Sequence, residues 1–196
     1  MKRYVTTLGM AFTIALPHAA HAQSVTPPPV PADIQVPAGN EAFLVGHAVG
    51  TQNYVCQPSS HLGRVAWTLF TPQATLFSDS GDQLITHFFS PNPVEGTVVR
   101  ATWQHSRDTS TVWAAAVASV ADPTASGAIA WVLLQTVGTQ TGPAGGDTLA
   151  KTTFVQRLNT LGGSAPGTGC DVLADVGHKA FVPYTADYFF YTGAAR

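Results

Sequence analysis

The chain has 196 residues, of which 45% are hydrophobic and only 10% are charged, with 9 Lys and Arg against 11 Asp and Glu. A charged fraction far below about a quarter argues against a cytosolic helical protein and favours a β-rich surface of Thr, Ser, Gln and Asn. The formal net charge of −2 and the lack of any Lys or Arg cluster exclude nucleic-acid binding, which depends on cations that neutralise phosphates.

Residues 1–22 have the pattern of a secretory signal peptide. Residues 1–3 (MKR) are a short basic start, residues 5–16 are uncharged and mostly apolar, and residues 20–22 (AHA) form a small-x-small cleavage site. The apolar run is too short to span a bilayer, and no later stretch reaches the roughly 20 apolar residues that a transmembrane helix needs. We therefore expect cleavage near Ala22 and a secreted or periplasmic protein without a membrane span.

The mature chain is predicted to be one all-β domain behind a lead-in. Residues 23–37 are rich in proline and should be extended and poorly ordered. In residues 38–196, short β-branched and aromatic runs alternate with Gly, Pro, Asn, Asp and Ser, which predicts a single-domain β-sandwich or flattened barrel with long loops. The predicted strands, in chain order, are residues 42–49, 53–56, 65–70, 74–77, 84–89, 97–105, 112–120, 129–137, 152–158, 179–182 and 188–191.

Two histidines in these strands are candidates for chemistry. Period-two alternation places His87 on one face with Ile85 and places His105 on one face with Trp103, so both histidines point inward or lie at the edge of the core. Together with Asp108 in the following turn they are the candidate metal ligands of this chain. The alternative for each histidine is a buried imidazole that is hydrogen-bonded to a backbone carbonyl.

Trp103 and Arg157 are candidates for ligand binding. Trp103 has polar neighbours in the sequence and could offer a stacking face, although core packing is the alternative. Arg157 lies within the largely apolar run 154–158, and a cation there needs a partner if it is buried. It could anchor an anionic or polar group, or it could be an ordinary outward-facing arginine.

Cys56 and Cys170 are the only cysteines, and we predict that they form a disulfide. Export favours this pairing, because oxidising compartments allow disulfides that the cytosol would reduce. The alternative is two buried free thiols. Metal ligation by this pair alone is less favoured, since zinc sites use four ligands with short local spacings.

An ordered series of sequence blocks resembles a known family. The blocks are residues 86–93 (THFFSPNP), 101–108 (ATWQHSRD), 129–134 (IAWVLL), 154–163 (FVQRLNTLGG) and 182–191 (VPYTADYFFY). They are similar to the secreted domain-of-unknown-function family numbered three-four-five-five, which is found in bacteria and fungi, and the resemblance covers about Val36 to Tyr191. It implies a secreted single-domain protein and adds no reaction, because the family has no established activity.

The function predicted from the sequence is non-catalytic binding of a small molecule, a glycan or an envelope component, without a cofactor. The candidate site residues are His87, Trp103, His105, Asp108 and Arg157. One alternative is a hydrolytic or redox enzyme in which His87 and His105 hold a divalent metal that activates a bound water. Another is a cell-surface interaction protein.

Overall fold

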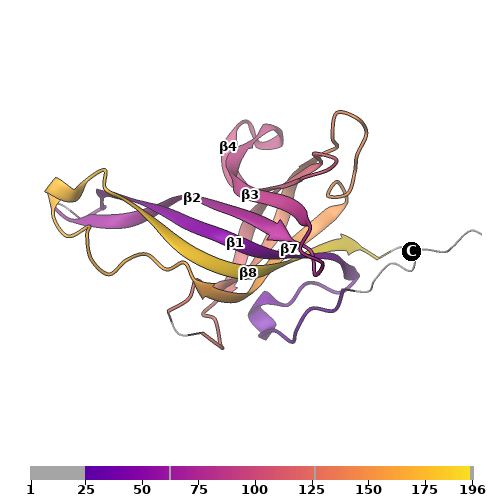
Figure 1. Ribbon diagram of the computed structural model, residues 1–196, viewed down its shortest axis with the longest axis horizontal. Helices are drawn as coiled ribbons and strands as arrows, with labels where there is room; N and C mark the ends of the chain where they lie inside the picture. Colours follow the sequence, from indigo (N-terminus) through magenta and orange to yellow (C-terminus); the bar gives the residue numbers. More distant parts are fainter. Residues whose placement is uncertain (1–24, 62, 126, 195–196) are drawn as a thin grey trace, which may run out of the picture.

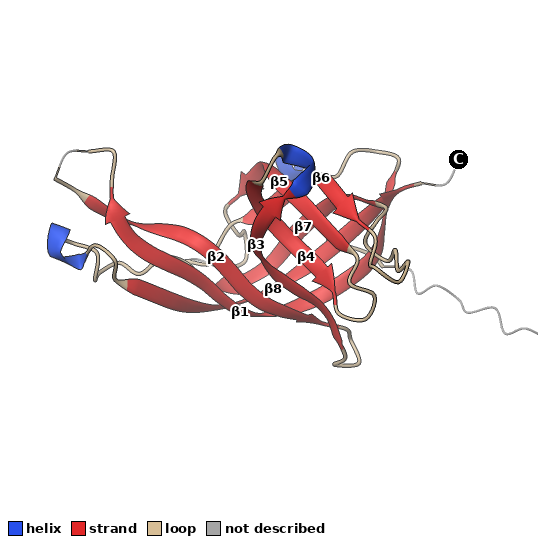
Figure 2. Cartoon of the chain, turned by 90° about the horizontal axis from the view of Figure 1, so that it is seen from above, coloured by secondary structure: helices blue, strands red, loops and turns tan. Residues whose placement is uncertain are grey.

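The computed structural model describes residues 25–61, 63–125 and 127–194, so the predicted signal peptide lies outside the described residues. Eight antiparallel strands pair in chain order and close into a barrel when the last pairs with the first, as Figures 1 and 2 show. The all-β prediction is confirmed, and of its two forms the barrel is the one observed. The strands are β1 (Asn40–Pro58), β2 (Val65–Phe77), β3 (Gln83–Asn92), β4 (Val98–His105), β5 (Thr111–Val120), β6 (Trp131–Gln140), β7 (Thr152–Gly162) and β8 (Lys179–Gly193).

Helical structure is limited to short 3₁₀ turns in the described residues. These are η1 (Ala32–Ile34), η2 (Pro93–Glu95) and η3 (Leu173–Asp175). None of the helices in this part of the chain is long and apolar enough to cross a membrane.

Three strands are longer than the sequence suggested, because each joins two predicted runs. Pro72 and Pro183 fall between those runs, yet β2 and β8 continue through them. The reason is that β2 pairs with β3 only from Ala74 onward and β8 pairs with β7 only from Tyr184 onward, so each proline lies where its strand has β1 as its single neighbour. A missing N–H is tolerated at such an edge. The extra lengths of β1, β2 and β8 project from the barrel as a three-stranded arm (Figures 1 and 2).

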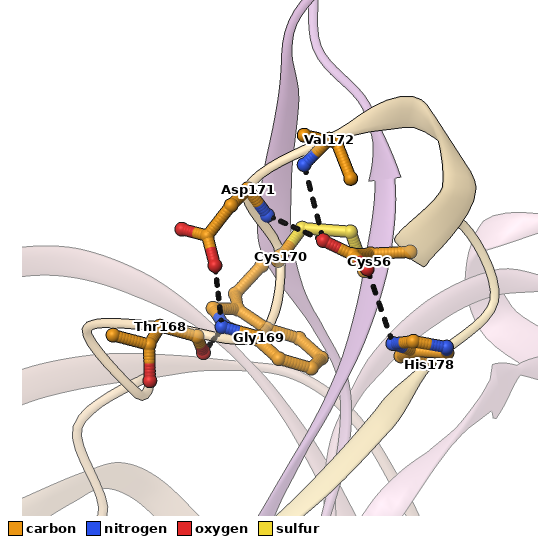
Figure 3. The surroundings of a disulfide bond; sticks show 9 residues. Cys56, Thr168, Gly169, Cys170, Asp171, Val172 and His178 are labelled. Atoms are coloured by element: carbon orange, nitrogen blue, oxygen red, sulfur yellow. Dashed lines mark hydrogen bonds and ion pairs between the residues drawn. A yellow bond between two sulfur atoms is a disulfide. The ribbon is translucent and has the colours of Figure 1, made fainter.

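The predicted disulfide is confirmed, and it fastens the segment before β8 to the arm. Cys56 of β1 is bonded to Cys170, and the described residues contain no free cysteine (Figure 3). The Cys56 N–H also donates to the His178 carbonyl at 2.9 Å, and the Gly177 N–H donates to the Cys56 carbonyl at 3.0 Å. The alternative of two free thiols is therefore wrong.

The proline-rich lead-in packs against the outside of the barrel, where the sequence suggested a poorly ordered segment. Ile34 of η1 is completely buried in a second apolar cluster with Trp131, Leu158 and other outward-facing side chains. The Gln156 side chain donates to the Ile34 carbonyl at 2.7 Å. Three valines of the lead-in supply further apolar surface to this cluster: they are Val25, Val30 and Val36.

Candidate functional site

A cavity of about 270 Å³ lies in the barrel, and all eight strands contribute side chains to it. The lining is mostly apolar, with a few polar groups from β1, β3, β4, β7 and β8. Its residues are Gln52, Leu69, Pro72, His87, Phe89, Val99, Arg100, Ala101, Trp103, Ala114, Ala115, Ala116, Val132, Leu134, Arg157 and Tyr188. Three of the five predicted site residues, His87, Trp103 and Arg157, therefore lie at one cavity.

His87 and Trp103 form a stacked pair in the cavity lining. They are cross-strand partners on β3 and β4, their ring centroids are 4.3 Å apart, and the ring planes differ by 6°. Trp103 is 1% exposed, and Tyr188 and Phe190 meet it edge-on. The Trp103 ring is thus covered by its neighbours, and it does not offer an open stacking face to a ligand.

The His87 imidazole is neutral and holds a defined tautomer. Its Nδ1 lies 2.8 Å from the Thr102 carbonyl oxygen, which can only accept, so Nδ1 carries the proton and Nε2 is the acceptor. Burial lowers the pKa of His87 to about 3, the positive charge of Arg157 adds to the shift, and the bond to Thr102 opposes it. This is the hydrogen-bonded buried histidine that was the alternative to a metal ligand.

Arg157 brings an unbalanced positive charge to the cavity. Its Nε and Nη2 donate to the Ala130 carbonyl at 3.1 and 2.8 Å, and no described carboxylate lies within ion-pair distance of it. Arg100 differs, because its Nε and Nη2 donate to the Glu95 carboxylate at 2.8 and 2.7 Å. Burial raises the pKa of the Tyr54 and Tyr184 phenols, and the Arg157 charge opposes both rises. The positive charge of Arg157 therefore lowers the pKa of groups inside the barrel.

Two buried donors at the cavity lack a partner. Among the described residues, four buried side-chain polar atoms make no hydrogen bond, and only Gln52 Nε2 and Trp103 Nε1 belong to the cavity lining. Gln52 is 2% exposed, and its side chain is close enough to the Tyr184 phenol to oppose the rise that burial causes in the pKa of Tyr184, although no contact of Gln52 Nε2 has hydrogen-bond geometry. Most buried polar groups in proteins are hydrogen-bonded, so two open donors at one cavity need an explanation.

Gln52 and Tyr188 were not among the predicted site residues. Gln52 lies between two predicted strands, residues 42–49 and 53–56. In the structure β1 is continuous there, and Gln52 is on the same face as Ala48 and Gly50. Tyr188 belongs to the inward-facing series Tyr184, Ala186, Tyr188 and Phe190, which the period-two pattern of β8 could have indicated.

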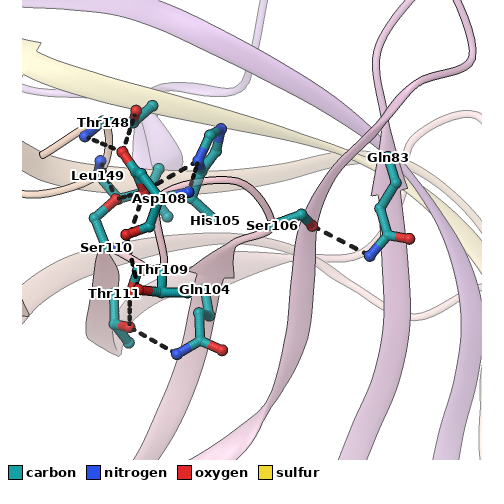
Figure 4. Close-up of polar contacts among 10 residues, drawn as sticks. All are labelled: Gln83, Gln104, His105, Ser106, Asp108, Thr109, Ser110, Thr111, Thr148 and Leu149. Atoms are coloured by element: carbon teal, nitrogen blue, oxygen red, sulfur yellow. Dashed lines mark hydrogen bonds and ion pairs between the residues drawn. The ribbon is translucent and has the colours of Figure 1, made fainter. Parts of the chain in front are cut away.

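His105 and Asp108 lie apart from the cavity lining, at the end of β4 and in the turn that leads to β5 (Figure 4). His105 Nδ1 is 3.0 Å from Asp108 Oδ1. The Asp108 carboxylate accepts from the backbone and side chain of Ser110 and of Thr148, at 2.6 to 3.0 Å. Burial raises the pKa of Asp108, but these hydrogen bonds outweigh burial and lower the pKa below its ordinary value. Asp108 thereby ties the turn to the connection between β6 and β7.

The three proposed metal ligands are not gathered in one place. His87 lines the cavity, whereas His105 ends β4 and Asp108 lies in the following turn. Within the described ranges no group of three or more His, Cys, Asp or Glu side chains is placed to hold a metal ion.

Two wider hollows lie on the surface, but neither is lined by an unpartnered buried polar atom. The first borders His47, which lies 2.6 Å from Asp187 and 2.8 Å from Asp79. These hydrogen bonds raise the pKa of His47, with Asp187 the larger contributor. The second borders Phe181, which is exposed on the arm. The barrel cavity is thus the candidate site.

Fold and cavity together define the class: a disulfide-bonded, eight-stranded antiparallel β-barrel with a small interior cavity. A family model, described as Protein of unknown function (DUF3455), matches residues 37–192, and the chain belongs to that family. The resemblance of the sequence blocks is thereby confirmed. No curated protein and no solved structure matches the chain.

Proposed function

We propose that the protein binds a small organic molecule in its barrel, outside the cytoplasm, without catalysing a reaction. The observation that carries this proposal is the cavity of about 270 Å³, to which every strand contributes. An eight-stranded barrel is just wide enough to be filled by side chains or to hold one small ligand. In this barrel the side chains leave an unfilled space that borders Gln52 and Arg157.

The character of the lining supports the proposal. Ligand pockets are mostly apolar and carry a few convergent polar groups that fix orientation. The cavity has this composition, with Gln52, His87 and Arg157 among its polar residues. The disulfide and the predicted signal peptide support a location outside the cytoplasm.

Titration calorimetry with two shape-matched probes, 2-naphthoate and the neutral 2-naphthalenemethanol, tests this function. The matched variants are Ala116→Phe, which adds a ring to the cavity lining, and Val117→Phe on the neighbouring position, which is 53% exposed and outside the lining. We expect one-to-one binding of at least one probe, weakened about tenfold or more by Ala116→Phe and unchanged by Val117→Phe. Absence of binding by both probes, or equal effects of the two variants, would contradict the proposed function.

A further inference from the structure

We propose that the barrel cavity selects a small monoanion, and that the Arg157 guanidinium binds the carboxylate or equivalent oxyanion of that ligand. This inference rests on the proposed function and adds the chemical class of the ligand. It is carried by three features of the lining: its charge, its hydrogen-bonding groups and its size.

The charge of the lining is unbalanced by one positive unit. The cavity residues include two arginines and no Asp or Glu. Arg100 is neutralised by Glu95, whereas Arg157 is held only by the Ala130 carbonyl. A cation that is partly removed from water without a counter-ion is costly, and a single bound anion would balance it.

The free hydrogen-bonding groups of the lining are predominantly donors. A guanidinium has five N–H groups in a planar fork, and Arg157 uses its Nε edge on Ala130. Its Nη1 and the second Nη2 N–H remain as a two-pronged end that matches the two oxygens of a carboxylate. Gln52 Nε2 and Trp103 Nε1, in two further residues of the lining, are buried donors without a partner. Such a set calls for a ligand rich in acceptors.

The size and polarity of the cavity restrict the remainder of the ligand. About 270 Å³ is at the lower end of the range for ligand pockets. Apart from the polar groups, the walls are aliphatic and aromatic, with Leu69, Phe89, Val132 and Leu134 among them. A compact, apolar body with one negative charge fits these walls, and a second charge would find no unpaired cation.

The test compares the affinities of 2-naphthoate and 2-naphthalenemethanol for the full mature chain by titration calorimetry. The probes differ only in the charged group, so their affinity ratio reports recognition of the anion. We expect the wild type to prefer naphthoate by about tenfold or more, as a charge-assisted hydrogen-bonded pair provides. Arg157→Gln should abolish the preference by weakening naphthoate alone, and Arg157→Lys should retain part of it. The control is Arg107→Gln, which removes an equal charge from an exposed position outside the cavity.

The possible failures are distinguishable. Equal affinity of the two probes for the wild type would overturn the anion inference and leave the proposed function standing, and this comparison needs no variant. A preference that survives Arg157→Gln or that disappears with Arg107→Gln would overturn the role of Arg157. Binding of neither probe would overturn the proposed function and the inference together.

Discussion

Arg157 and His87 show how two polar side chains are accommodated in one apolar barrel. His87 is neutral because burial disfavours its cation, although the hydrogen bond from its Nδ1–H to the Thr102 carbonyl acts in the opposite direction. Arg157 cannot lose its charge, so the Ala130 carbonyl satisfies one edge of the guanidinium and the cavity leaves its end accessible. At the residue scale, burial keeps the imidazole of His87 neutral, whereas Arg157 stays charged and has no carboxylate partner, as the proposed anion site requires.

The neutrality of His87 gives a pH prediction. The pKa of His87 is about 3 in the folded protein and 6.5 ordinarily, so the unfolded chain takes up this proton at a higher pH than the folded chain does. The contribution of neutral His87 to stability is therefore lost as the pH falls from 6.5 towards 3. In an NMR titration, the His87 ring should keep the neutral Nδ1–H form at pH 5. His47, held by Asp187 and Asp79, should titrate above 6.5 in the same sample. A His87 ring that titrates near 6.5 would contradict the buried, hydrogen-bonded assignment.

At the scale of elements, the turn between β4 and β5 is organised by Asp108. Four hydrogen bonds from Ser110 and Thr148 converge on its carboxylate. The Gly146 of the facing connection packs so closely that an added Cβ would lie 2.2 Å from the Asp108 Cβ. The glycine-rich connection between β6 and β7 therefore packs closely against this turn.

Asp108→Asn should destabilise the barrel, because an amide NH₂ would replace one acceptor oxygen and face N–H and O–H donors. We expect the free energy of unfolding to fall by about 2–3 kcal/mol, as loss of hydrogen bonds to a charged group implies. Urea unfolding measures this change. Asp147→Asn, on an exposed residue of the same connection, is the control and should be within about 0.5 kcal/mol of wild type. Equal stabilities of the two variants would refute the assigned role of Asp108.

The site could be anticipated from the sequence only in part, and the reasons are geometric. Alternation along a strand gives the face of a side chain, which directs attention to His87, and the apolar neighbours of Arg157 in the sequence direct attention to that cation. Alternation does not show how far along the barrel axis a side chain lies. His105 pairs with Ile85, two positions away from the His87–Trp103 pair and next to the turn. Gln52 could not be found in this way, because β1 continues through Gln52 only by pairing with β2 and β8. That pairing joins segments far apart in the sequence.

At the scale of the whole molecule, composition and turn chemistry predicted an all-β chain, and cysteine usage predicted the disulfide. Barrel closure depends on the pairing of β1 with β8, which joins the two ends of the domain. No local pattern specifies this pairing. The lead-in over residues 25–37 likewise packs on strands far away in the sequence, with Ile34 against Trp131 and Leu158.

The disulfide should stabilise the fold through the unfolded state. Cys56 and Cys170 are separated by 114 positions, and closing such a loop is worth at most about 5 kcal/mol in the chain-entropy model. A Cys56→Ser/Cys170→Ser variant should unfold at lower urea concentration and should still bind 2-naphthoate, because neither cysteine lines the cavity. If the double variant kept its full stability, the bridge would have no stabilising role.

The central claim, that the barrel interior receives a small ligand, is tested most directly by NMR chemical-shift mapping with 2-naphthoate. We predict saturable shifts of the Trp103 indole N–H and the Gln52 side-chain amide, which line the cavity without a partner. The backbone amides of Val49 and Phe181, beside the hollow on the outer surface, should not move. Shifts confined to Val49 and Phe181, or no shift at Trp103 and Gln52 at saturating probe, would contradict the account.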